Sequence, residues 1–273
     1  MSLTLGRHFG VVGRQGGQIT SLRRFGVPAG GAFDKESMAL ANALTGNRLD
    51  EQIWELSMAQ ATFRVESEGV VGVVGAKAEV RYGAEILDSG TVFAVGRGDE
   101  FVVDAPTEGA RVYVSIGSSC RDSGWRVRLD KPSTNVTSRN VVRVVEGPQA
   151  EMFDRRVLDW PFTVSRTGNR VGIRLEESIG AHKIELPSEP QCVGAIQVTN
   201  DGTPILIGPD GPTIGGYPKI AVVASCDIGR VAQLTPGDMV RFEQCTVERA
   251  REIAALSRQE LNRRIQLLQF SIS

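Results

Sequence analysis

The chain has 273 residues, which is enough for two domains or for one large β domain. Its charges nearly cancel, because 31 lysines and arginines stand against 32 aspartates and glutamates. This balance argues against a dedicated nucleic-acid surface or a polybasic membrane surface. The sequence has no apolar run near the roughly 20 residues of a membrane-spanning helix, and residues 1–10 lack the apolar region of a signal peptide.

The cysteines and histidines limit the kinds of metal site and catalytic site that we expect in this chain. The four cysteines form no CxxC pair, which is typical of reduced thiols in a cytoplasmic protein. Neither His8 nor His182 lies in a local motif, so we expect no zinc site and no Ser-His-Asp triad. The sequence has no GxxxxGK[ST] loop and no GxGxxG, so a nucleotide would need an unfamiliar site or a partner chain. Lys77 and Lys219 lack the Met-Lys-Met setting of a biotin carrier, so we expect no covalently bound biotin.

One helix is predicted near the start of the chain. Asp34 can cap it, and Gly46 stands where a left-handed residue would end it. Short Val- and Phe-rich runs separated by glycine turns then predict strands. These runs are 61–66, 70–74, 78–82, 91–95, 100–103 and 111–116. Strands without intervening helices favour an antiparallel barrel or sandwich.

The second half repeats this pattern after a polar segment at 119–140, which we predict to be a linker with a short strand at 125–129. We therefore expect an N-terminal β subdomain at 1–118, a C-terminal β subdomain at 141–245 and a helical region at 246–273. The predicted strands of the second half are 141–146, 161–165, 170–175, 194–198, 204–207, 219–226, 230–234 and 239–243. Thr246 can cap the final helix, and a capping-box pattern at 257–260 predicts a break in it. The apolar stripe of this helix fits packing on the β domain, or a contact with another chain.

The most informative stretch is 188–220, because it is polar and glycine-rich yet lies between apolar strand-like runs. Glycine permits close backbone approach to a ligand, and proline stiffens a loop. A rigid loop that carries acid, amide, hydroxyl and amine groups is the composition expected of a site. The alternative is a set of hairpin turns, since Asn-Asp-Gly and Pro-Asp-Gly are ordinary turn sequences.

Several short segments resemble the family that includes the C component of bacterial ATP-dependent 5-oxoprolinase, allophanate hydrolase subunit 2, the KipA antagonist of KipI and part of the carboxyltransferase domain of urea carboxylase. In the first half they are 13–16 (GRQG), 26–34 (GVPAGGAFD), 41–47 (ANALTGN) and 55–56 (EL). In the second half they are 169–175 (NRVGIRL), 188–189 (SE), 194–198 (GAIQV), 201–205 (DGTPI), 210–218 (DGPTIGGYP) and 233–238 (QLTPGD). The similarity spans nearly the whole chain.

The resemblance implies a mainly β, cyclophilin-like β-barrel fold for the C-terminal subdomain. It also implies two partners, a KipI-like protein as the B component and a LamB/YcsF-like protein as the A component. With them the chain would open 5-oxoproline to glutamate by using ATP. Independently of the resemblance, the carboxylate oxygens of Asp34, Glu55 and Asp210 could hold Mg²⁺. Three departures stand out. Gly10 and Val11 replace the family's Gln-Asp, Ile214 replaces the second Thr of TTGG, and a GRxLxxGD segment is missing from 117–140.

The candidate site residues follow from the chemistry of amides. Breaking amide resonance requires an oriented substrate and stabilisation of developing oxyanion charge. We predict three catalytic residues, Gln197, Asp210 and Lys219, because amide, carboxylate and ammonium groups suit these tasks. The predicted substrate-binding residues are Arg14, Asp34, Asn42, Glu55, Arg170, Glu189, Thr213, Gly215, Gly216 and Tyr217. No dedicated metal site is predicted.

Each assignment has a structural alternative. Asp34 is also a helix cap, and Arg14 or Arg170 could pair with Glu55 or Glu189 as structural ion pairs. Three functions stay open at this point. They are one component of a 5-oxoprolinase-type hydrolase, a carboxyltransferase half-domain that acts on a urea-like acceptor and needs a separate biotin carrier, and a binding module that sequesters a KipI-like regulator.

Overall fold

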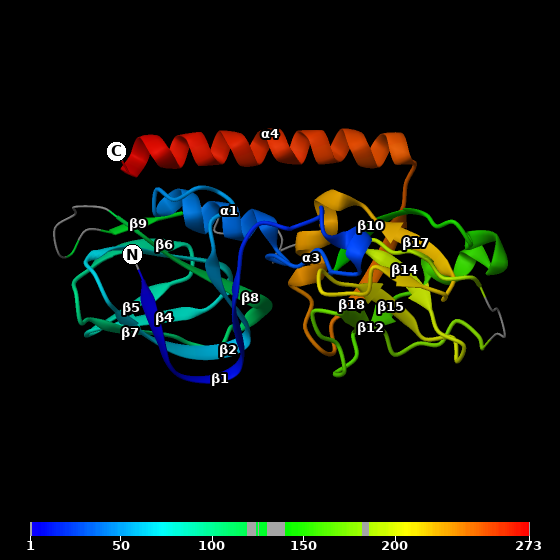
Figure 1. The fold of residues 1–273 in the computed structure, drawn as a ribbon, viewed down its shortest axis with the longest axis horizontal. Helices are drawn as coiled ribbons and strands as arrows, with labels where there is room; N and C mark the ends of the chain where they lie inside the picture. Colours follow the sequence, from blue (N-terminus) through cyan, green and yellow to red (C-terminus); the bar gives the residue numbers. More distant parts are fainter. Residues whose placement is uncertain (1, 119–123, 125, 130–139, 182–185, 273) are drawn as a thin grey trace. The chain divides into compact units, whose positions relative to one another are not determined.

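The computed structural model describes residues 2–118, 124, 126–129, 140–181 and 186–272 (Figure 1). Most of the predicted linker at 119–140 and His182 lie outside these residues. The architecture is mainly β with few helices, as the sequence predicts. Two compact units divide the chain: unit 1 is 1–17, 34–137 and 259–273, and unit 2 is 18–33 and 138–258. The predicted domain boundaries stay predictions.

Unit 1 is built on a 9-stranded sheet with the order β5-β4-β7-β2-β8-β3-β6-β9, in which β1 also pairs antiparallel with β2. Its elements are β1 (Leu3–Gln15), α1 (Lys35–Leu44), β2 (Ile53–Val65), β3 (Gly69–Lys77), β4 (Glu79–Tyr82), β5 (Glu85–Asp88), β6 (Thr91–Val95), β7 (Glu100–Val103), β8 (Glu108–Gly117) and β9 (Arg126–Arg128). Phe63, Phe93 and Phe101 pack in its core, with ring centroids 5.3 and 5.6 Å apart. Burial of such large apolar side chains is the main stabilising contribution.

Helix α1 lies close against this sheet because two strand glycines leave room for its backbone. A Cβ added to Gly72 would come 3.0 Å from the Ala41 carbonyl oxygen, and one added to Gly117 would overlap the Thr45 carbonyl oxygen. Asp34 accepts a hydrogen bond from the Ser37 backbone and so caps the helix as predicted. The predicted helix end is also confirmed, since Gly46 has a φ of 71°.

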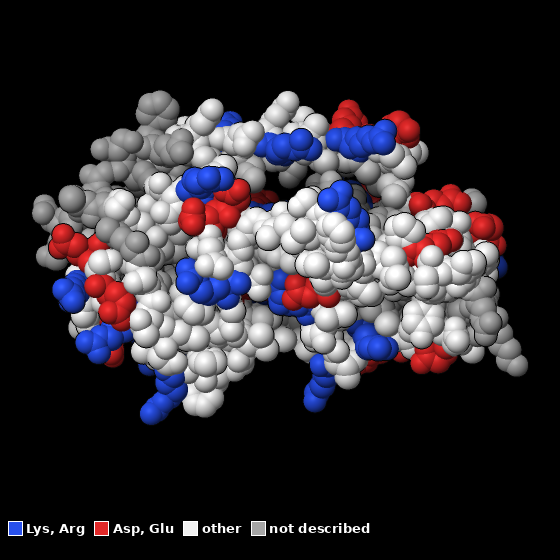
Figure 2. Space-filling model, viewed as in Figure 1, with Lys and Arg blue, Asp and Glu red and all other residues white. Residues whose placement is uncertain are grey.

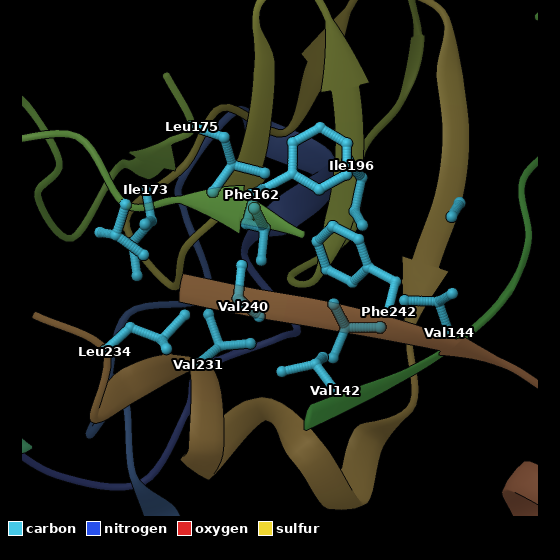
Figure 3. Close-up of a cluster of buried hydrophobic side chains, with 14 of the residues drawn as sticks. Val142, Val144, Phe162, Ile173, Leu175, Ile196, Val231, Leu234, Val240 and Phe242 are labelled. Atoms are coloured by element: carbon cyan, nitrogen blue, oxygen red, sulfur yellow. The ribbon is translucent and has the colours of Figure 1, made fainter. Parts of the chain in front are cut away.

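Unit 2 is built on a 7-stranded sheet with the order β11-β18-β10-β17-β14-β15-β12, and β13 and β16 form a separate short pair. Its elements are the 3-10 turns η1 (Arg23–Phe25), η2 (Ala150–Met152), η3 (Arg155–Asp159) and η4 (Ser225–Asp227), the helix α3 (Ile228–Ala232), and the strands β10 (Val141–Glu146), β11 (Phe162–Thr163), β12 (Gly172–Arg174), β13 (Glu189–Pro190), β14 (Ala195–Val198), β15 (Pro204–Ile207), β16 (Ile214–Gly215), β17 (Lys219–Val223) and β18 (Met239–Gln244). Figure 3 shows the core, where Phe162, Ile196 and Phe242 gather with aliphatic side chains from several strands and from α3.

The structure differs from the predicted elements in several places, and the short strands β5, β13 and β16 are among the elements that the prediction lacks. A strand is predicted at 230–234, but α3 occupies most of these residues, since a short apolar run fits a buried helix equally well. The final helix, α4 (Val247–Ile272), is continuous, so the predicted break at 257–260 is wrong. The strand β1 is missing from the prediction, because its glycines and register shifts hide any alternation of apolar and polar residues.

Basic and acidic side chains are mixed on the face shown in Figure 2, in keeping with the balanced composition. Within the described part of the chain, no helix is long and apolar enough to cross a membrane.

Candidate functional site

The sheet of unit 2 fixes Gln197 and Lys219 side by side. Ile196 and Val198 face the apolar core, so Gln197 between them faces the opposite side of β14. Gln197 is the cross-strand partner of Lys219 on β17, next to a register shift between Ile196 and Gln197. Both side chains are buried, with 5% of each residue exposed. Two polar side chains are thus held on one buried patch of the sheet.

Lys219 is held by an ion pair and a glutamine. Its Nζ lies 2.8 Å from Oε2 of Glu189, and its backbone N–H donates to Oε1 of Gln149 at 3.0 Å. Gln149 also donates from Nε2 to the Glu189 carboxylate at 3.2 Å. The hydrogen bond from Lys219 is the main reason that the pKa of Glu189 is lowered from its ordinary value. Glu189 therefore stays ionised beside a buried ammonium group.

Gln191 differs from these neighbours because its side chain has no hydrogen-bond partner among the residues that the structure describes. Its backbone is fixed at both ends: its N–H donates to the Thr213 carbonyl at 2.8 Å, and its carbonyl accepts from Arg23 at 2.5 Å. The residue is 5% exposed, and within the described part of the chain neither Nε2 nor Oε1 has a hydrogen-bond partner. A Cβ on Gly215 would lie 2.8 Å from Nε2 of Gln191 and 3.3 Å from Nε2 of Gln197. Two glutamine amides therefore lie against one glycine.

We call this group the glutamine cluster. Its members are Gln149, Glu189, Gln191, Gln197 and Lys219. Three carboxamides supply donors and acceptors, and the ion pair supplies both signs of charge. Such a set can orient an amide substrate and can stabilise charge that develops on its oxygen. No three His, Cys, Asp or Glu side chains gather as a metal site among the described residues.

Arg170 and Asp210 form a second polar feature of unit 2. Arg170 donates to both carboxylate oxygens of Asp210, at 2.7 and 2.9 Å, and to the Gly31 carbonyl at 2.8 Å. This two-bond geometry is the strong form of an arginine–carboxylate pair. The structure thus places these two predicted site residues together in an ion pair.

Three other predicted residues lie near the glutamine cluster. The Thr213 carbonyl accepts from the Gln191 backbone, and the Tyr217 carbonyl accepts from Nε2 of Gln197 at 3.4 Å. The residue Tyr217 itself is 43% exposed. A Cβ on Gly216 would lie 3.0 Å from the Leu186 carbonyl oxygen, so the glycine permits a close backbone crossing.

The four predicted residues in the first part of the chain belong to unit 1, and three of them are buried in its structure. Asp34 caps α1, and its backbone N–H donates to the Tyr113 hydroxyl at 2.8 Å. That hydroxyl donates to Oε2 of Glu55 at 2.8 Å. The other carboxylate oxygen of Glu55, Oε1, lies 3.6 Å from Nε of Arg111. Burial is the main cause that raises the pKa of Tyr113 well above its ordinary value, so the phenol stays protonated and can donate.

Asn42 is likewise held within unit 1. Its Nδ2 donates to the Glu51 carbonyl at 2.9 Å and more weakly to that of Leu49 at 3.4 Å, and its Oδ1 accepts from Ser115 at 2.7 Å. Asn42 is fully buried. The amide therefore closes the chain after α1 onto the sheet, and its donors and acceptor are already used.

Arg14 is exposed on β1, where its guanidinium carbon lies 5.6 Å from the centre of the Trp54 ring. This is the geometry of a cation–π contact. Among the described residues Arg14 makes no ion pair, so the structural alternative of a pair with Glu55 or Glu189 finds no support, and the substrate-binding role of Arg14 stays a prediction.

Sequence reasoning missed Gln149, Gln191 and Arg23. Gln191 lies inside the stretch at 188–220, so its position there was a usable signal. Gln149 follows Gly147, where an added Cβ would overlap the Lys219 carbonyl oxygen, but nothing in the sequence reveals that close crossing.

Comparisons with known proteins agree with this fold. A family profile described as carboxyltransferase domain, subdomain A and B, matches residues 25–121 and 118–244. The chain belongs to this family, and the resemblance read from its motifs is confirmed.

Among curated relatives, the chain is 28% identical over 275 residues to the C component of the Escherichia coli 5-oxoprolinase, and the match covers 86% of this chain and 89% of that protein. It is 26% identical to the same component of the Haemophilus influenzae 5-oxoprolinase over 85% of this chain and 87% of that protein. It is also 23% identical to the urea amidolyase of Saccharomyces cerevisiae, of which it spans 16%. The crystal structure of the K. lactis urea amidolyase shares the fold, with a TM-score of 0.81 at 23% identity over 96% of this chain and 20% of that one.

Proposed function

We propose that the chain is the C component of an ATP-dependent hydrolase that opens a cyclic amide, with 5-oxoproline as substrate and glutamate as product. One observation carries the proposal: the glutamine cluster presents amide donors and acceptors beside a buried lysine, and its Gln191 side chain has no hydrogen-bond partner among the described residues. The similarity to two 5-oxoprolinase C components over nearly their whole length supports it. The partners are a KipI-like protein and a LamB/YcsF-like protein, as the B and A components.

In this proposal each group has a task. A lactam resists hydrolysis because its nitrogen lone pair is delocalised into the carbonyl, and ATP as co-substrate supplies the driving force. Gln197 and Lys219 orient the lactam and stabilise charge on its oxygen. Glu189 holds the Lys219 side chain in place through an ion pair. Asp210 acts as a positioning residue, because its bonds to Arg170 order the loop that leads to Gly215 and Tyr217.

The test is ATP-dependent release of glutamate from 5-oxoproline, measured for the chain alone and for the assembly with both partner chains. We expect activity in the assembly. We expect Lys219→Met to lower the rate by roughly 10²-fold, the usual effect of removing one group that stabilises an oxyanion. Lys77→Met is the matched control, because Lys77 forms an ion pair of the same 2.8 Å length with Glu108 at an exposed place in unit 1.

Two outcomes would count against the proposal. One is a stable assembly of all three chains that releases no glutamate. The other is an equal loss of activity in the Lys77 and Lys219 variants, which would show that the glutamine cluster has no special part in the reaction. If Lys219→Met does not fold, Gln197→Ala provides a second test of the role of the glutamine cluster in the reaction.

A carboxyltransferase activity on a urea-like acceptor is the second candidate, and the family profile favours it. The chain spans 16% of the urea amidolyases that it resembles, so this activity would need a biotin carrier and further domains from elsewhere. Carboxylation of urea from a supplied carboxybiotin donor, in place of glutamate release, would favour this candidate.

A further inference from the structure

We propose that Gln191 determines the substrate specificity of this site, by pairing its side-chain carboxamide with the N–H and C=O edge of a cis amide. The inference rests on the proposed function for the class of substrate. γ-Lactams are cis amides, and ureas present the same edge with an N–H beside the C=O. Neither the motifs of the sequence nor the relatives' names assign a role to this residue.

The first step is the cost of the buried amide. Protein interiors leave very few polar atoms without a partner, because a buried donor or acceptor that loses its water must be compensated. Gln191 is 5% exposed, and both polar atoms of its side chain lack a partner in the described part of the chain. A ligand that supplies one acceptor and one donor would remove this cost. The Gln191 side chain therefore serves ligand binding rather than the stability of the fold.

The second step is preorganisation. The backbone of Gln191 is held by Thr213 on one side and by Arg23 on the other. Gly215 leaves room for its amide, because any Cβ there would lie 2.8 Å from Nε2. Gln149 offers the contrast within the same cluster, since its amide is used by Lys219 and Glu189. Binding therefore costs little ordering at Gln191.

The third step is the geometry of the two amides. A primary carboxamide carries an N–H donor and an oxygen acceptor on one edge. A lactam ring forces its own N–H and C=O onto one edge, so that two hydrogen bonds form together with the carboxamide. An ordinary peptide bond is trans and points its N–H and C=O in opposite directions. Gln191 thereby selects small cyclic amides and ureas against peptides.

The first experiment separates a ligand role from a structural role. Gln191→Met conserves volume and removes an amide that has no hydrogen-bond partner in the described part of the chain, so we expect unchanged or increased stability towards urea. Gln149→Met is the matched control, because it removes bonds to Lys219 and Glu189, and we expect it to lower the unfolding midpoint. A loss of stability in Gln191→Met equal to that of the control would overturn the inference.

The second experiment measures binding by calorimetry with 2-pyrrolidinone, N-methyl-2-pyrrolidinone and urea, using the assembly of the three chains. We expect the wild type to bind 2-pyrrolidinone at least about tenfold more tightly than the N-methyl compound, since a site built to pair with an N–H rejects an analogue that lacks it. We expect this ratio to fall to about one in Gln191→Met. No discrimination in the wild type, or the same discrimination in Gln191→Met, would overturn the inference.

The two proposals fail in different ways. Gln191-dependent binding of 2-pyrrolidinone without glutamate release would contradict the proposed hydrolase and support the role of Gln191. Ring opening of N-methyl-5-oxoproline to N-methylglutamate at the same rate as ring opening of 5-oxoproline to glutamate would do the reverse. Gln191-dependent binding of urea alone would keep the cis-amide edge as the recognised group and would move the substrate towards the carboxyltransferase reaction.

Discussion

Each of the two units buries a group of polar side chains, and the two groups are used in opposite ways. In unit 1, Asp34 and Asn42 are bonded to Tyr113 and Ser115 of β8, which ties α1 to the sheet, and Glu55 accepts from the same Tyr113 hydroxyl. In unit 2, the glutamine cluster leaves the amide of Gln191 without a partner among the described residues. Similar residue types therefore build a structural network in one unit and a candidate binding site in the other. The hydrogen bonds that Asp34, Asn42 and Glu55 make, rather than residue type or burial, distinguish these three residues from Gln191.

The largest effect is expected from a substitution that breaks the hydrogen-bond network of unit 1. Asn42→Ala removes bonds to Glu51 and Ser115 and leaves buried polar atoms without partners, so we expect a loss of about 3 kcal/mol in the free energy of unfolding. Urea unfolding measures it. Asn140→Ala is the control, because the exposed amide of Asn140 makes one bond to Met239, and we expect less than about 0.5 kcal/mol. Equal losses in both variants would contradict the contrast between the units.

A smaller effect is expected from a substitution in the glutamine cluster of unit 2. Gly215→Ala places a methyl group 2.8 Å from the Gln191 amide and 3.3 Å from that of Gln197, and both side chains can shift. We expect the fold to persist and the rate of glutamate release to fall roughly 10- to 100-fold, because small displacements of positioning groups are costly in catalysis. Gly13→Ala is the control in unit 1, where the nearest atom lies 3.7 Å away. Full activity in Gly215→Ala would remove this glycine from the site.

The smallest expected effect is a dependence on pH. The pKa of Glu189 is lowered from 4.5, chiefly by the hydrogen bond from Lys219. The stability that this pair contributes is therefore present above pH 4.5 and is lost as the pH falls through the lower pKa of the folded state. Carboxyl NMR titration checks this: we expect Lys219→Met to raise the pKa of Glu189 towards 4.5. An unchanged pKa would show that Lys219 does not stabilise the carboxylate.

The sequence predicts local features well and distant ones poorly. The Asp34 cap and the Gly46 end of α1 depend on neighbours within a turn, and both predictions are confirmed. The prediction of a strand at 230–234 is wrong because α3 depends on tertiary packing, including the ion pairs that Asp227 makes with Arg143 and Arg230.

The same limit applies to the candidate site. The stretch at 188–220 is predicted from its composition, and it contains most of the glutamine cluster. Gln149 could not be predicted, because its place beside Lys219 follows from a backbone crossing at Gly147. The orphaned amide of Gln191 is a property of the whole fold, since it depends on every described neighbour that fails to reach it. The assignments of Gln197 and Lys219 as catalytic residues stay predictions. Asp210, which is also predicted to be catalytic, is proposed instead as a positioning residue, because both its carboxylate oxygens accept from Arg170.

The most direct measurement compares the side-chain amides of the two units by NMR. The chain, labelled with ¹⁵N at Asn and Gln and assembled with unlabelled partner chains, is titrated with 5-oxoproline. Gln191→Met and Asn42→Ala identify the two signals. We expect the NH₂ signal of Gln191 to shift on binding and that of Asn42 to stay in place. A shift at Asn42 with none at Gln191 would contradict the assignment of the binding site to unit 2.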